Sequence, residues 1–326
     1  MSDRSEVDAF VFDGEGVGKR LGANDPAELP HDGASPAFTW THLYLNGQNT
    51  ISWLEQSGLD RFVLDALTAA ETRPRCTVHG DGVLLNLRGV NLNPGAEPED
   101  MVSIRLWIEK TRVVSVWLRP LLAVRDLFEA IERGHAPATP GELVARLALR
   151  LADRAEPTIA TFNERIDTLE EAIVDEAAEI PQQHLGDVRR VSIVLRRYMF
   201  PQRDALTTLE VEDLSWLTDR DRSRLREAAE RVTRLAEDLD SIRDRAQVIH
   251  DQVMERRAEV MNKQMLVLSI AAAVFLPLGL LTGLLGINVG GMPGIDNAWA
   301  FWIVCALLVA MAGGLIWSFR RLGLLR

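Results

Sequence analysis

Two apolar runs without a single charged side chain lie near the end of the chain, at 265–285 and 298–319. Each is about 20 residues long, so as an α-helix rising about 1.5 Å per residue it spans the roughly 30 Å hydrocarbon core of a bilayer. Between Gln264 and Phe319 there is no lysine or arginine, and Asp296 is the only charged residue. The pattern predicts a transmembrane hairpin over residues 264–326.

Basic residues lie just outside both apolar runs: Arg256, Arg257, Lys263, Arg320, Arg321 and Arg326. Because lysine and arginine concentrate on the cytoplasmic side of a membrane protein, we expect both flanks in the cytoplasm and the 286–297 loop outside. The N-terminal MSDRSEVDAF has no apolar stretch and is not a signal peptide. These features predict a multi-pass protein of the plasma membrane (the bacterial inner membrane) with both termini cytoplasmic.

The residues before the first run carry a long helical pattern. Apolar residues recur at alternating spacings of three and four, typical of a coiled-coil seam: Leu225, Ala228, Val232, Leu235, Leu239, Ile242, Ala246, Ile249 and Val253. Neither glycine nor proline interrupts the stretch from Asp219 until Pro277. One helix from Asp219 to Leu285 is about 100 Å long, so the pattern predicts a stalk that joins a cytosolic domain to the membrane.

Two further helices are expected upstream. Thr139 and Glu142 form a capping-box pattern ahead of an amphipathic stretch that runs to about Ala178, within which Pro157 should kink or divide the helix. The second helix runs over about 184–208. It carries a basic cluster, interpreted as a solvated or ion-paired face with a subunit contact as the alternative: Arg189, Arg190, Arg196, Arg197 and Arg203. Residues 137–263 thus form a long-helix region.

Residues 1–136 predict a mixed α/β cytosolic domain. Besides Ala9–Phe12, the expected strands are short runs rich in Val, Ile, Leu and Trp: Thr39–Leu45, Arg75–His79, Val83–Leu87, Val102–Glu109 and Val113–Leu118. The expected helices are Asn49–Gln56, Arg61–Ala70 and Leu121–Arg133. Gly16-Val17-Gly18 lacks the spacing of a phosphate-binding loop, so we interpret it as a turn. The fold class is α+β.

Composition narrows the function classes. The net charge of −11 makes the chain a poor partner for nucleic acid; it suits the gathering of cations, although solubility alone explains it. Cys76 and Cys305 form neither a disulfide framework nor a zinc finger. Residues 1–136 contain no clustered nucleophile, base or metal triad, so we expect no enzyme and no cofactor.

Several motifs resemble one family, the CorA-type divalent metal ion transporters. They are the juxtamembrane Asn262, the step Phe275-Leu276-Pro277, and Gly286-Ile287-Asn288 ahead of a second span. The segments 87–95, 98–101 and 290–294 (LRGVNLNPG, PEDM and GGMPG) are similar to the ZntB branch, associated with zinc. The resemblance covers essentially the whole chain. It implies a homopentameric funnel in which five first spans line a central pore.

The resemblance also implies that Gly286, Ile287 and Asn288 form the selectivity ring at the outer pore mouth. Gly286 gives backbone freedom where a helix must end, and an amide oxygen can replace part of an ion's hydration shell. Helix capping is the alternative role for Gly286 and Asn288.

Helical spacing back from Gly286 nominates a pore-facing stripe: Gly279, Leu276, Ala272, Leu268, Met265, Met261, Ala258, Met254 and Asp251. Met265, Leu268 and Leu276 are candidates for hydrophobic constrictions, and Gly279 lies at mid-pore. Asp251 and His250, before the span, are candidate metal-binding residues, because imidazole favours zinc over magnesium. A solvated helix surface is the alternative for both.

Neither apolar run contains an ionisable residue, which indicates that the ion crosses largely hydrated. The expected cargo is Zn²⁺, taken up with possible proton coupling through groups at the pore ends such as Asp251 or Asp296. The alternatives are a Mg²⁺, Co²⁺ or Ni²⁺ channel of the CorA type, and a membrane-anchored coiled-coil scaffold that conducts nothing. The expected partners are further copies of the chain, the lipid bilayer and divalent cations.

Overall fold

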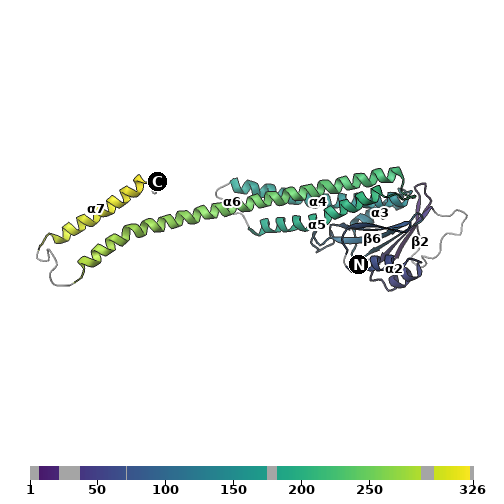
Figure 1. The fold of residues 1–326 in the computed structure, drawn as a ribbon, viewed down its shortest axis with the longest axis horizontal. Helices are drawn as coiled ribbons and strands as arrows, with labels where there is room; N and C mark the ends of the chain where they lie inside the picture. The colour runs from purple at the N-terminus through teal and green to yellow at the C-terminus, as the bar shows by residue number, and fades with distance from the viewer. Residues whose placement is uncertain (1–6, 22–36, 71, 175–181, 288–296, 324–326) are drawn as a thin grey trace. The chain divides into compact units, whose positions relative to one another are not determined.

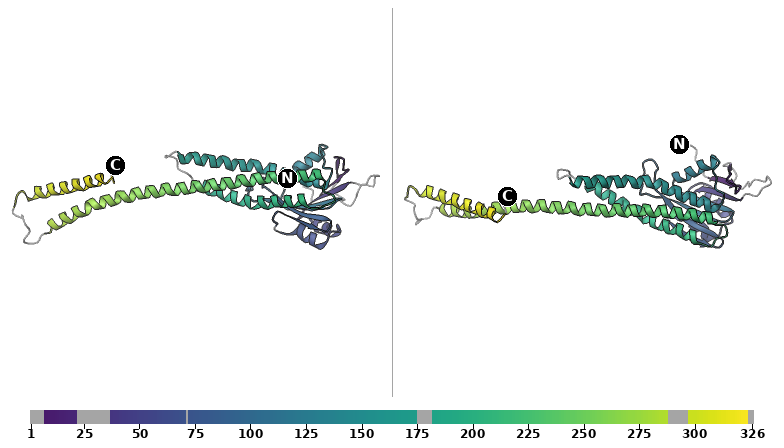
Figure 2. Two further views of the ribbon diagram at one scale, coloured as in Figure 1. Left: turned by 45° about the horizontal axis from the view of Figure 1, so that its top comes forward. Right: turned by 90° about the horizontal axis from the view of Figure 1, so that it is seen from above.

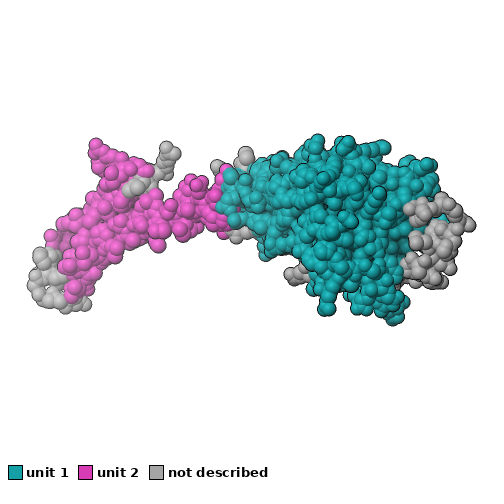
Figure 3. Space-filling model, turned by 45° about the vertical axis from the view of Figure 1, so that its right-hand side comes forward, with its two compact units in different colours: residues 1–249 teal, residues 250–326 magenta. Residues whose placement is uncertain are grey.

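The computed structural model describes residues 7–21, 37–70, 72–174, 182–287 and 297–323. They belong to two compact units, residues 1–249 and residues 250–326 (Figure 3). The first unit contains a sheet and most of the helices. The second contains the end of the longest helix and one further helix.

Seven strands form one sheet in the order β2-β1-β3-β7-β6-β5-β4. Neighbouring strands are antiparallel except for β3 and β7, which are parallel. The strands are β1 (Val7–Phe12), β2 (Gly18–Leu21), β3 (Phe38–Tyr44), β4 (Arg75–His79), β5 (Gly82–Gly89), β6 (Val102–Ile108) and β7 (Arg112–Trp117). The mixed α/β fold is confirmed, and each predicted strand lies within two residues of its observed bounds.

The strand β2 was not among the strands expected from the sequence. The turn expected at Gly16-Val17-Gly18 lies earlier, because Gly18 already begins β2. The bend contains Gly14 and Gly16, whose φ values of +82° and +102° favour glycine. The chain then pairs with β1, placing Gly18 opposite Phe12. A four-residue polar edge strand has no apolar alternation to reveal it, and β1 supplies the hydrogen-bonding partner.

Both faces of the sheet are covered (Figures 1 and 2). The larger core contains residues of the sheet, α3 (Leu122–Glu132), α4 (Pro140–Val174), α5 (Gln182–Val211) and the first part of α6 (Asp219–Leu285). The smaller core lies beneath α1 (Thr50–Gln56) and α2 (Arg61–Thr68). Residues up to Ile249 therefore fold as one body around the sheet.

The long helices follow the predicted pattern closely. Pro157 lies inside α4 without dividing it, and the predicted end of this helix at Ala178 lies outside the described residues. Eight of the nine seam residues of α6, from Leu225 to Ile249, are buried within the first unit. Val253, the ninth, belongs to the second unit and is half-buried.

The basic cluster on α5 is an ion-paired face. Arg190 Nη1 lies 2.8 Å from Glu99 Oε1, and Arg203 Nη2 lies 2.6 Å from Asp204 Oδ1. Arg196 pairs with Asp240 of α6. For these three arginines the first interpretation is confirmed.

Helix α6 continues without interruption to Leu285, and α7 (Ala300–Arg321) runs back antiparallel to it (Figure 1). The most apolar 18-residue stretch has a mean hydropathy of 2.3 in each helix. These are the two candidate membrane spans among the described residues, where the sequence predicts them.

Candidate ion pathway

The outer turn begins where α6 ends. The Gly286 N–H donates to the carbonyl of Thr282 at 2.9 Å and lies 3.3 Å from that of Gly283. A Cβ at this position would lie 3.0 Å from the Thr282 oxygen, so a side chain would crowd the last turn. Ile287 follows with half of its surface exposed. Asn288 lies outside the described residues, and its place in a selectivity ring stays a prediction.

The nominated pore-facing stripe is uncovered in the single chain. Met265 is 59% exposed, and Leu268 and Leu276 are each 71% exposed. Ala272 and Gly279, between and beyond them, are exposed as well. No described residue of the second unit covers this line of residues, so it is available to another copy of the chain or to a water-filled path.

The half-covered residues of the same span lie on the opposite side of α6. They are Ile270, Ala271, Val274, Pro277, Leu278 and Leu281. At about 100° per residue their mean direction is nearly opposite to that of the nominated stripe. In α7 the half-covered positions likewise recur at helical spacing, at Val304, Cys305, Leu308, Met311, Ala312 and Leu315. We attribute both half-covered faces to the packing of the two spans.

The ends of α7 carry aromatic residues. Trp299, Phe301 and Trp302 are 65–70% exposed at its start. Near its end the Arg321 guanidinium lies 5.3 Å from the centre of the Trp317 ring. Exposed aromatic residues at both ends of an apolar helix are typical of the two membrane interfaces.

The predicted metal-binding pair belongs to no three-ligand cluster among the described residues. His250 is half-buried and Asp251 exposed at the start of the second unit. In the described parts of the chain, no three His, Cys, Asp or Glu side chains lie close enough together to hold a metal ion. Burial, and then the charge of Glu212, raise the pKa of the Cys76 thiol to about 12, which disfavours the thiolate that binds metals.

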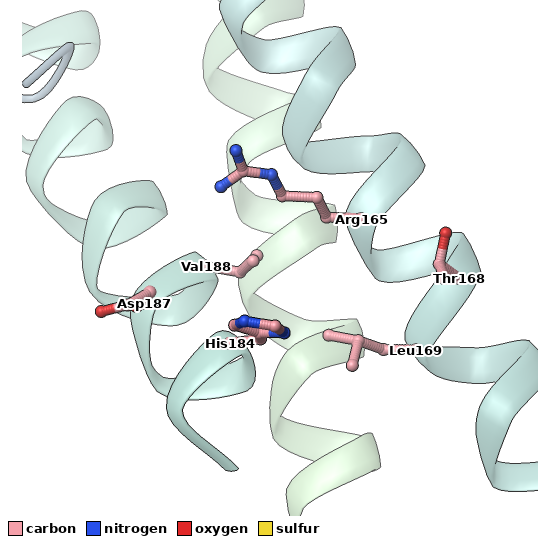
Figure 4. Close-up of a pocket in the computed structure, with 6 residues that line it drawn as sticks. All are labelled: Arg165, Thr168, Leu169, His184, Asp187 and Val188. Atoms are coloured by element: carbon pink, nitrogen blue, oxygen red, sulfur yellow. The ribbon is translucent and has the colours of Figure 1, made fainter. Parts of the chain in front are cut away.

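A cavity of about 410 Å³ lies between α4 and α5, lined by Arg165, Thr168, Leu169, His184, Asp187 and Val188 (Figure 4). His184 and Leu169 point toward one another from the two helices (Figure 4). With one imidazole and one carboxylate it lacks a zinc ligand set. It belongs to the first unit and lies outside the nominated stripe.

A sequence model of the family described as "CorA-like Mg2+ transporter protein" matches residues 35–321. The chain belongs to this CorA-like transporter family. The resemblance predicted from its motifs is therefore confirmed, and so is the expectation that it is not an enzyme.

Two curated relatives are similar to this CorA-like chain over almost its whole length. The "Divalent cation transporter CmaX" of Pseudomonas aeruginosa is 42% identical, covering 98% of this chain and 97% of that protein. The "Zinc transport protein ZntB" of Pectobacterium carotovorum is 35% identical, covering 97% of this chain and 94% of that protein.

Solved structures agree with the architecture of the CorA-like chain. The structure of full-length CmaX superposes with a TM-score of 0.84 at 41% identity, covering 99% of both chains. The CorA magnesium transporter of Methanocaldococcus jannaschii superposes with a TM-score of 0.81 over 98% of this chain and 99% of that one. At 17% identity the second likeness concerns the fold alone.

A partly buried polar network holds the start of α6. Thr218 and Asp221 cap α6 reciprocally: the Thr218 hydroxyl donates to Asp221 Oδ2 at 2.7 Å and accepts the Asp221 N–H at 3.2 Å. The Thr139 hydroxyl also donates to this carboxylate, at 2.9 Å, and accepts the Glu142 N–H at 2.9 Å. The N-termini of α4 and α6 are thereby joined.

Glu142 extends the network with charge. Its carboxylate accepts the Ala138 N–H at 2.9 Å, one residue before the position that a capping box predicts, and pairs with Arg146 and Arg224. Burial alone would raise the pKa of Glu142, but the Ala138 N–H and the two guanidinium groups outweigh it and lower the pKa. The sequence analysis found the Thr139 and Glu142 motif but missed Thr218 and Asp221. The same motif spacing ahead of α6 was the available signal.

Proposed function

We propose that this divalent cation transporter of the CorA and ZntB type carries Zn²⁺ into the cell through the central axis of a homopentamer. The observation that carries the proposal is the uncovered stripe of α6, uncharged from Met254 to Gly279, which ends at Gly286 and Ile287 on the side away from the half-covered face. Five such stripes around an axis would form an apolar pore, with Asn288 at its outer mouth. Apolar constrictions of this kind open and close by wetting and dewetting.

The choice of Zn²⁺ rests on the relatives named zinc transport proteins, at 34–35% identity over most of the chain. It also rests on His250 beside Asp251, because imidazole suits zinc better than magnesium. Uptake is favoured because an inside-negative potential contributes roughly 2.3 kcal/mol per charge per 100 mV to cation entry. The basic flanks, including Arg320 and Arg321, support the cytoplasmic placement of both termini.

Proton coupling would require a titratable group on the pathway. The described parts of the two spans contain no Asp, Glu, His or Lys side chain, and the groups that can ionise there are the Cys305 thiol and the terminal arginines of α7. Coupling would therefore use groups at the pore ends, of which Asp251 and Asp296 are the candidates.

A second candidate function is a Mg²⁺, Co²⁺ or Ni²⁺ channel. The family description names Mg²⁺, and the relative named CmaX is described as a divalent cation transporter without a stated metal. A pore that conducts hydrated ions would discriminate weakly among them, because Mg²⁺ keeps its waters in such a site.

The deciding experiment measures uptake by proteoliposomes that contain the purified protein. Zn²⁺ and Mg²⁺ are compared with and without an imposed pH gradient. Zn²⁺ flux that rises with the gradient supports the proposal, including its proton coupling. Mg²⁺ flux that is indifferent to the gradient would favour the channel, and absence of flux for both ions would favour a non-conducting scaffold.

A further inference from the structure

A buried arginine lies in the middle of the sheet, and no acidic side chain among the described residues pairs with it. Arg105, in β6, is only 1% exposed. Its Nη2 donates to the carbonyl of Ala69 at 2.6 Å and lies 3.5 Å from that of Ala70. Its Nε and Nη1 have no hydrogen-bond partner. Buried donors are almost always paired in folded proteins, so two orphan donors on one buried cation need an explanation.

The neighbouring polar groups are also buried without hydrogen-bond partners. Asn86, in β5, is directly opposite Arg105 in the register and is also 1% exposed. Both polar atoms of its side-chain amide lack a partner, as does the hydroxyl of Thr72. Thr72 is 7% exposed and belongs to the segment that follows α2. This segment also supplies the carbonyls that Arg105 contacts.

Arg88 places a second positive charge near Arg105. Arg88 lies two residues beyond Asn86 on the same strand, and its guanidinium donates to the carbonyls of Thr72 and Met101 at 2.7–3.0 Å. Burial, and then the positive charge of Arg88, lower the pKa of Arg105. Arginine nevertheless stays protonated in proteins. A buried cation that cannot release its proton and has no counter-charge strongly destabilises the fold.

We propose that Arg105, Asn86 and Thr72 bind a small monovalent anion of the halide class, such as chloride, on the face of the sheet beneath the segment that follows α2. The unpartnered groups are mainly donors: two guanidinium nitrogens, an amide nitrogen and a hydroxyl. Water would satisfy some of these donors but would not compensate the charge. The site is deep, with Arg105 and Asn86 both 1% exposed, which favours a compact ion over a larger oxyanion.

The test uses the full-length protein in detergent, with bromide as the probe because its anomalous scattering locates it directly. Crystals of the unaltered protein, grown or soaked in bromide, should show an anomalous peak within hydrogen-bond distance of Arg105. In parallel, the thermal midpoint is followed while gluconate is replaced by chloride at constant ionic strength. Between about 1 and about 150 mM chloride it should rise by about 5 °C and approach saturation.

Two variants make the measurement specific. Arg105→Met removes the charge and keeps most of the volume, so the rise with chloride should disappear. Arg112→Met serves as the matched control: Arg112 lies on the adjacent strand and already pairs with Glu109 at 2.9 Å, so this variant should keep the rise.

A third variant tests an internal occupant. Glu71 precedes Thr72 in the sequence and lies outside the described residues. A bromide peak at Arg105 that occurs only in Glu71→Gln would mean that the Glu71 carboxylate is the counter-ion, and would overturn the proposal. A peak in neither protein would leave water as the occupant and overturn it too. If the unaltered protein shows the bromide peak but Arg105→Met keeps the same rise of the thermal midpoint with chloride, the bromide is adventitious.

Discussion

The hydroxyl of Thr139 donates a hydrogen bond to the carboxylate of Asp221, with 2.9 Å between Oγ1 and Oδ1. Thr139 immediately precedes α4 and Asp221 lies in the first turn of α6, so one contact joins the starts of two helices 82 residues apart. Asp221 is 2% exposed, and a hydrogen bond to a buried charged group is among the stronger ones. Near this contact Gly141 meets Asp221 and Leu217 so closely that a Cβ would lie 2.8–2.9 Å from their atoms.

The first prediction concerns the strength of this contact. Thr139→Val should lower the free energy of unfolding by about 1–2 kcal/mol, because it removes the cap of α4 and a partner of Asp221. A double-mutant cycle with Asp221→Asn, followed by thermal unfolding of the full-length protein, should give a coupling energy of about 0.5–3 kcal/mol.

Thr139→Val combined with Asp219→Asn provides the control for this cycle. Asp219 is exposed in the same turn of α6, so the two effects should add. Additive effects in the Asp221 cycle as well would show that the hydrogen bond does not couple the two helix starts.

The second prediction concerns the outer mouth. Asn288→Ala should abolish or deregulate Zn²⁺ transport in proteoliposomes while the oligomer persists, because the proposed role of the amide is to contact the ion rather than to stabilise the fold. Asn297→Ala in the same loop is the control. The Asn297 side chain accepts the Trp299 N–H at 3.0 Å, which stabilises the turn before α7, so its loss should leave metal selectivity intact. Unchanged Zn²⁺ flux in Asn288→Ala would remove Asn288 from the pathway.

The third prediction concerns the constriction. Leu268→Asp should raise basal ion leak, because a ring of carboxylates would hydrate an apolar narrowing. Val267→Asp places the same charge on a side of α6 that points away from the stripe. It should reduce membrane insertion without increasing the leak per inserted protein. Equal leak in the two variants, measured with a fluorescent ion indicator in vesicles, would contradict the assignment of Leu268.

The fourth prediction concerns pH and the first unit. Burial lowers the pKa of His42 from 6.5 to about 3, against the opposing effect of the Asp8 charge. His42 Nδ1 lies 2.7 Å from the Ser115 hydroxyl, to which the Trp40 indole donates at 2.7 Å. The unfolded chain therefore binds a proton between about pH 6.5 and about pH 3 that the folded protein does not bind. Stability is complete above pH 6.5 and should fall as the pH is lowered, by up to about 1.4 kcal/mol per pH unit.

Thermal or denaturant unfolding at pH values between 7 and 4 measures this slope. His42→Gln should reduce it while also lowering stability at pH 7, because the replacement disturbs a packed site. His135→Gln, at an exposed position, should leave the slope unchanged. A slope that is the same in His42→Gln and the unaltered protein would assign the acid sensitivity to the carboxylates instead.

Patterns that repeat along one segment could be predicted without the structure. The seam from Leu225 to Ile249 and the two uncharged runs specify α6 and α7 locally, because helical spacing and membrane length are properties of consecutive residues. The same holds for β5 and β6, whose apolar residues mark them as strands. The pore-facing stripe was nominated on the same basis, from helical spacing. A selectivity ring would in addition require several copies of the chain, whose arrangement a single sequence does not describe.

Features that depend on residues far apart in the chain could not be predicted. The edge strand β2 has no apolar alternation and is recognised only through its pairing with β1. The cross-strand pair of Asn86 and Arg105 depends on the register of β5 and β6, and the Thr139 and Asp221 contact joins segments that neither helix pattern relates. Local sequence thus determined the membrane hairpin, through the length of its uncharged runs, and the helical stalk, through the spacing of its apolar residues. Tertiary structure decided which polar groups are buried together, because their partners and their exposure to water are set only when distant segments pack.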